Sequence, residues 1–74
     1  MAQLPVVSGR QVIRALEKAG FNIKRQRGSH VALGKPGYPH TISVPDYPDV
    51  RPGTLRSIIN RAGLTVQEFV QLLR

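Results

Sequence analysis

The chain lacks cysteine and has few acidic residues. It has no cysteine, two histidines and four acids among 74 residues. The absence of cysteine excludes a disulfide framework and thiolate chemistry. The spacing of the histidines and acids matches no structural zinc site, so we expect neither a metal nor a cofactor. No apolar run is long enough to cross a bilayer, and the start of the chain has no signal-peptide core. We therefore expect a soluble, cytoplasmic protein without a membrane partner.

The length predicts one domain, residues 1–74, with a thin apolar core. A chain of this size buries only about 60–65% of its extended surface. Its charge, in contrast, is large and uneven. Residues 10–35 carry seven basic residues against Glu17 alone, a balance of +6, and residues 36–74 add only +1 to the total of +7. A basic half on a small domain indicates a nucleic-acid partner, with a basic face that merely aids solubility as the alternative.

Three helices are predicted from capping residues and apolar spacing. Ser8 and Gln11 form a capping box that begins a helix over residues 9–19, which Gly20 ends. A second helix begins near Pro52 or Thr54 and ends at Gly63. A second capping box begins the third helix. The residues expected to bury these last two helices are Leu55, Ile58, Ile59 and Ala62, then Val66, Phe69, Val70 and Leu73.

Three strands are predicted between the first two helices, because apolar residues alternate with polar ones there. The first begins at Phe21, the second covers residues 29–33, and the third covers 40–44. The order α-β-β-β-α-α predicts an α+β fold, with the helices on one face of a three-stranded antiparallel sheet. We expect Phe21 and Ile23 to face the core. By alternation the open face displays Lys24, His30, Ala32, Thr41 and Ser43.

His30 is the candidate catalytic residue. Imidazole both accepts and donates protons near neutral pH, and RNA supplies its own nucleophile, the 2′-hydroxyl. Cations would stabilise the negative charge that develops on the phosphate during cleavage. The candidate cations in this sequence are Lys24, Arg25 and Arg27. Gly28 and Ser29 either bind phosphate or simply form the turn. His40 shares the parity of the buried residues of its strand, which favours a structural role.

An ordered set of short motifs resembles the HicA family of toxin–antitoxin systems. The set comprises Val7-Ser8-Gly9-Arg10, Ala19-Gly20-Phe21, Arg27-Gly28-Ser29-His30, Val44-Pro45, Pro52-Gly53-Thr54-Leu55-Arg56 and Ala62-Gly63-Leu64-Thr65. The resemblance implies a double-stranded-RNA-binding-like fold, cleavage of mRNA, and a HicB-type antitoxin that covers the active face. It also implies that the histidine of the Gly-Ser-His motif, His30, is catalytic. From their charge and their position in the turn, we expect Lys24, Arg25, Arg27, Gly28 and Ser29 to contact the RNA.

The chain departs from the family pattern after Val44-Pro45. Family members often carry another histidine there, whereas this chain has Asp46-Tyr47-Pro48. If a second acid–base group is needed, Lys24, Tyr47 or water remains. Two other functions stay open: an RNA-binding module without catalysis, which would use the same basic face, and a DNA-binding regulator. The regulator would use the second and third helices, because their spacing matches a helix-turn-helix.

Overall fold

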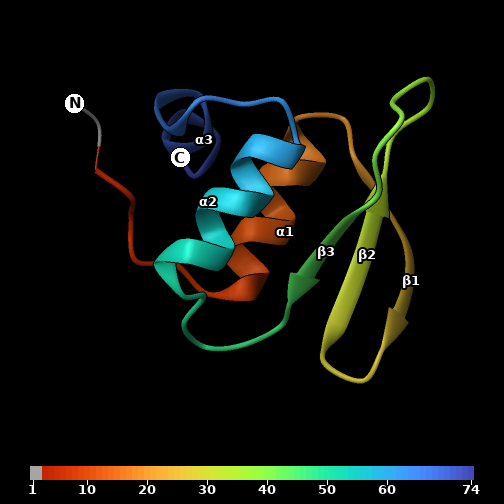
Figure 1. Cartoon of the computed structure of the whole chain (residues 1–74), viewed down its shortest axis with the longest axis horizontal. Coiled ribbons are helices and arrows are strands. Elements are labelled where there is room, and N and C mark those ends of the chain that lie inside the picture. Colours follow the sequence, from red (N-terminus) through yellow and green to blue (C-terminus); the bar gives the residue numbers. More distant parts are fainter. Residues whose placement is uncertain (1–2) are drawn as a thin grey trace.

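The computed structural model describes residues 3–74, which form an α+β fold with the predicted element order (Figure 1). Its elements are α1 (Gly9–Lys18), β1 (Asn22–Arg27), β2 (His30–Gly34), β3 (Ile42–Pro45), α2 (Pro52–Arg61) and α3 (Val66–Leu72). The strands form one antiparallel sheet in the order β1-β2-β3, so the predicted meander is confirmed. Pro5 disfavours a helix near the start of the chain, so the sequence predicts an extended segment over residues 1–7. Residues 1–2 lie outside the described part, and residues 3–7 form no helix or strand.

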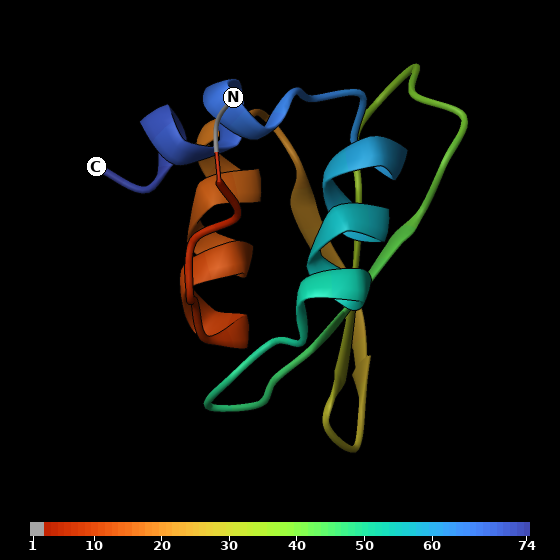
Figure 2. The same cartoon turned by 60° about the vertical axis from the view of Figure 1, so that its left-hand side comes forward.

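The helices lie together on one side of the sheet (Figure 1). A turned view shows α1 and α2 side by side, with α3 near the ends where both helices finish (Figure 2). This arrangement fits the double-stranded-RNA-binding-like fold that the resemblance implies. Within the described residues, no helix lies over the other face of the sheet. Within residues 3–74, no helix is both long and apolar enough to cross a membrane.

Helix α1 begins at the predicted capping box. Ser8 Oγ accepts a hydrogen bond from the Gln11 backbone N–H at 3.2 Å, and Gln11 Oε1 accepts one from the Ser8 N–H at 2.9 Å. These two bonds satisfy backbone donors that a helix start leaves free. Val12 and Leu16 are fully buried on one side of the helix. Gly20, at φ +99°, turns the chain into β1, as expected for a left-handed cap.

The later helices also start as predicted, and α2 buries the residues predicted for it, whereas α3 buries only one of its four. In α2, Leu55, Ile58 and Ile59 are buried. The Thr65–Glu68 capping box of α3 is present, with bonds of 3.0 and 2.8 Å. Phe69 is fully buried, whereas the other apolar residues of α3 are half-buried because this helix lies at the end of the molecule. Both capping boxes predicted from the sequence are therefore confirmed.

The core lies between the helices and the inner face of β2 and β3. Val31, Leu33, Ile42 and Val44 are all nearly inaccessible. Ile23 lies on the core side of the sheet as expected, but half of this residue is exposed. Ile23 pairs with Leu33 and so lies on the same face, but β1 is an edge strand and all six of its residues are exposed. The alternation of side chains along the strand therefore predicted the face of Ile23 correctly, but it could not show that an edge position leaves the side chain half exposed.

Candidate active site

His30 begins β2 and lies on the open face of the sheet. The strand alternates between exposed or half-buried residues and buried ones, with Val31 and Leu33 only 3% and 0% exposed. His30 itself is exposed. Because successive strand residues point to opposite faces, the imidazole projects away from the helices. The orientation predicted from the sequence is therefore confirmed.

A β-bulge in β1 brings two arginines to the same face. The register joins Ile23 to Leu33 and then Arg25 to Ala32, so Lys24 is an extra residue without a partner. Arg27 is then the partner of His30. Directly paired residues in an antiparallel sheet share a face, so both arginines lie on the side of the imidazole. Simple alternation through Lys24 would have placed them on the other face.

The bulge leaves Lys24 at the far end of the sheet from His30. An added Cβ on Gly34 would lie 2.3 Å from Lys24 Cε, so the lysine side chain crosses this glycine. Gly34 is four residues beyond His30 on β2. At about 3.3 Å per residue, the two positions are about 13 Å apart. The structure therefore brings Arg25 and Arg27 to His30 but keeps Lys24 away from it.

The open face is hollowed beside His30. The hollow has a volume of about 220 Å³. Its lining comprises Arg25, Arg27, His30, Ala32, Thr41 and Ser43. Ala32 leaves space at its centre because its side chain is short, and the two hydroxyls come from β3. Two guanidinium groups, two hydroxyls and one imidazole thus surround a space open to solvent, which suits an anionic ligand.

The β1–β2 turn contributes mainly backbone structure. Gly28 has φ +56°, an angle that favours glycine, and a Cβ there would meet no atom within 4 Å. Gln26 Nε2 donates to the Gly28 carbonyl at 3.2 Å. The Ser29 carbonyl accepts from the Asp46 N–H at 2.6 Å, which ties this turn to the segment after β3. Gly28 and Ser29 therefore form the turn beside His30, and neither lines the hollow.

Residues 45–47 place an aromatic ring against the imidazole. The Tyr47 carbonyl accepts from the Gly9 N–H at 2.8 Å, and Asp46 forms a 3.3 Å ion pair with Arg10. With the bond to Ser29, these contacts hold the segment between α1 and the β1–β2 turn. The Tyr47 ring, 46% exposed, meets the His30 ring edge-on with centroids 6.2 Å apart. The sequence left Tyr47 as one of three candidates, and the structure puts it beside His30.

The other histidine lies outside the hollow. His40 is exposed, and its ring contacts Tyr38 edge-on at a centroid distance of 5.6 Å. Within residues 3–74, no three histidine or acidic side chains gather closely enough to form a metal-ligand cluster. Of the two histidines, therefore, only His30 lies beside arginines in the described part of the chain.

Comparison with known proteins agrees with this geometry. The model of the family described as the HicA toxin of bacterial toxin–antitoxin systems matches residues 9–64. This range runs from the first residue of α1 to just beyond α2, and it includes the whole sheet and the hollow. A search of curated proteins finds no match. Since the family model covers most of the 74 residues, the chain belongs to the HicA family, the toxins of bacterial toxin–antitoxin systems.

Proposed function

We propose that this toxin is a metal-independent endoribonuclease that cleaves mRNA in the hollow beside His30. The observation that carries the proposal is the pairing of His30 with Arg27, next to Arg25, on an uncovered sheet face. An imidazole within a group of guanidinium ions provides both proton transfer and charge stabilisation. RNA needs both when its own 2′-hydroxyl attacks the adjacent phosphorus.

The proposed reaction needs no nucleophile from the protein. His30 takes the proton of the 2′-hydroxyl, whose oxygen bonds to phosphorus while the bond to the 5′-oxygen breaks. The leaving 5′-oxygen takes a proton from imidazolium or water, and the products are a 2′,3′-cyclic phosphate and a free 5′-hydroxyl. Arg25 and Arg27 would stabilise the additional negative charge on the phosphate oxygens. Thr41 and Ser43 offer hydroxyl donors from the opposite side of the hollow.

Tyr47 supports the same function as a stacking surface. Its ring is half exposed and its backbone is fixed by the bond to Gly9. Unpaired RNA bases stack on exposed aromatic rings, which contribute about 1–3 kcal/mol per base. A base on Tyr47 would hold its neighbouring phosphate close to His30.

Replacing His30 tests the catalytic assignment. We expect His30→Ala to slow cleavage of labelled RNA, measured in EDTA, by about 10²–10⁴-fold. Its melting temperature should hardly change, because surface substitutions usually alter stability by less than about 0.5 kcal/mol. His40→Ala is the matched control and should keep full activity. Cleavage by His30→Ala at the wild-type rate would exclude this mechanism, as would cleavage of 2′-O-methyl RNA.

The same experiment separates the two alternative functions. An RNA-binding module without catalysis would retain labelled RNA but leave it intact, for the wild type as well as for His30→Ala. A DNA-binding regulator built on α2 and α3 would prefer duplex DNA. Cleavage of RNA that disappears with the imidazole is expected only of the nuclease.

The family implies a cognate antitoxin, which we propose is of the HicB type. An acidic partner that covers Arg27 and His30 would exclude RNA by occupying the hollow, and opposite charge would speed its association. We expect the product of the adjacent gene to stop cleavage in a stable complex. A complex that leaves His30 accessible and cleavage undiminished would contradict this part of the proposal.

A further inference from the structure

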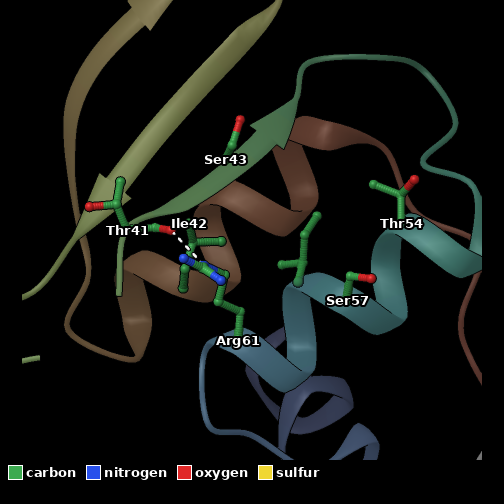
Figure 3. Close-up of a pocket in the computed structure, with 7 residues that line it drawn as sticks. Thr41, Ile42, Ser43, Thr54, Ser57 and Arg61 are labelled. Atoms are coloured by element: carbon green, nitrogen blue, oxygen red, sulfur yellow. Dashed lines mark hydrogen bonds between the residues drawn. The ribbon is translucent and has the colours of Figure 1, made fainter. Parts of the chain in front are cut away.

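A second and larger hollow lies on the other side of β3, between that strand and α2 (Figure 3). Its volume is about 350 Å³, within the about 300–1,000 Å³ range of ligand pockets. The residues that line it are Thr41, Ile42, Ser43, Thr54, Ser57, Ile58 and Arg61. The proposed cleavage reaction does not use this space.

The lining combines apolar and polar side chains in a way that fits a nucleotide. Ile42 and Ile58 are only 1% and 4% exposed, so they form the floor where strand and helix meet. Hydroxyl groups come from both α2 and β3, and Arg61 is the one charged residue in the lining. An apolar floor accepts a base, while hydroxyls and a guanidinium suit a ribose and a phosphate.

The Arg61 side chain is already directed across this hollow. Its Nε donates to the Thr41 carbonyl at 3.0 Å, which links the last turn of α2 to the start of β3 (Figure 3). The Arg61 carbonyl accepts from the Tyr38 hydroxyl at 2.5 Å. Within residues 3–74 the terminal amino groups of Arg61 make no hydrogen bond or ion pair. The guanidinium is thus held in place with donors free for a ligand.

Two residues join this hollow to the one beside His30. Thr41 and Ser43 line both spaces, so only the width of β3 separates them. Neighbouring strands are about 4.8 Å apart, so an extended strand of RNA crossing β3 would reach both hollows. β3 is an edge strand, and among residues 3–74 no further strand pairs with it on that side.

We propose that the hollow between β3 and α2 binds a nucleotide of the RNA strand that passes His30. Its base lies over Ile42 and Ile58, and its phosphate meets Arg61. This inference rests on the proposed function, because it takes RNA as the ligand of the neighbouring site. An acidic segment of the antitoxin is the competing occupant. RNA is favoured because the hollow shares Thr41 and Ser43 with the space where the scissile phosphate would lie.

The test measures binding without cleavage, so that it is independent of catalysis. A fluorescent 2′-O-methyl hexaribonucleotide, which has no free 2′-hydroxyl to react, is titrated with the full chain and its variants. Arg61→Gln should weaken binding by about 5–20-fold, since one charge-assisted contact is lost. Arg56→Gln is the matched control, because Arg56 is exposed on the same helix but does not line the hollow.

A second pair of variants does not depend on the Arg61–Thr41 bond. Ser57→Glu places a carboxylate in the hollow and should weaken binding at least as much as Arg61→Gln. Asn60→Glu adds the same charge to an exposed position of α2 outside the lining, and should weaken binding by less than about 2-fold. The variants at Arg56, Ser57 and Asn60 should melt within a few degrees of the wild type, since these residues are exposed. Arg61→Gln also loses the bond to the Thr41 carbonyl and should melt lower by at most about 4–8 °C.

The outcomes separate this proposal from the ribonuclease proposal. Equal losses within each matched pair would mean that net charge alone controls binding, and the nucleotide site would be wrong. If the variants lose affinity for the antitoxin but keep their affinity for the oligonucleotide, the antitoxin occupies the hollow, and the nucleotide site would again be wrong. If binding depends on Arg61 but RNA is never cleaved, the nucleotide site is supported and the ribonuclease proposal is refuted. If cleavage depends on His30 but none of the variants in the hollow weakens oligonucleotide binding, the ribonuclease proposal is supported and the nucleotide site is refuted.

Discussion

Gly9 offers the sharpest test of how the segment of residues 45–47, beside His30, is held. It is buried as the first residue of α1, and its N–H donates to the Tyr47 carbonyl. A Cβ at this position would lie 2.1 Å from the Pro45 carbonyl oxygen and 2.7 Å from Asp46 Cα. Both are backbone atoms, which cannot rotate out of the way as a side chain can. Gly9→Ala must therefore push residues 45–47 away from α1.

The expected loss of stability follows from three contributions. Overpacking against backbone belongs at the upper end of the usual range, about 3 kcal/mol. Loss of the bond to Tyr47 adds about 1 kcal/mol. Alanine has the higher helix propensity, which offsets at most about 1 kcal/mol. The net destabilisation is about 3–4 kcal/mol, which for a domain of this size lowers the melting temperature by about 12–32 °C.

Thermal unfolding followed by circular dichroism measures this loss, with Gly53→Ala as the matched control. Gly53 is the second residue of α2, and a Cβ there would meet no atom within 4 Å. Gly53→Ala should raise stability by about 0.5–1 kcal/mol through helix propensity and a less flexible unfolded chain. If Gly9→Ala melts at or above the wild-type temperature, the close packing of α1 on residues 45–46 is refuted.

Three further predictions concern RNA binding and the sheet. In a salt titration, the logarithm of RNA affinity should fall with the logarithm of salt concentration at a slope of about −2 to −3.5, the value for three to five phosphate contacts on a single strand. A slope near zero would remove the electrostatic argument. Ile23→Ala should cost less than about 1 kcal/mol in urea unfolding, whereas Leu33→Ala, on the same face, should cost about 2–5 kcal/mol; equal costs would contradict the edge position of β1. Tyr47→Ala should weaken binding of the 2′-O-methyl oligonucleotide by about 5–20-fold while Tyr47→Phe binds normally. If Tyr47→Phe binds normally but no longer cleaves RNA, the hydroxyl takes part in proton transfer and stacking is not its main role.

Local patterns in the sequence were enough to predict most of the fold. The two capping boxes and the left-handed turn at Gly20 depend on residues close together in the chain, and all are present. The alternation around Val31 and Leu33 likewise placed His30 on the open face, because side chains in a strand follow a strict period of two. The orientation of the candidate catalytic residue was thus already determined by its neighbours in sequence.

Tertiary structure decided which groups accompany His30. The bulge at Lys24 depends on which backbone groups of β1 and β2 pair, and no residue pattern in the sequence indicated it. It nevertheless places Arg25 and Arg27 on the side of the imidazole and leaves the Lys24 side chain at Gly34. The exposure of Ile23 depends on the position of β1 at the edge of the sheet. Tyr47 reaches His30, and Arg61 lines the second hollow, only when α1 and α2 pack on β3. Periodicity is set by neighbouring residues, whereas register, burial and hollows result from contacts between segments distant in the chain.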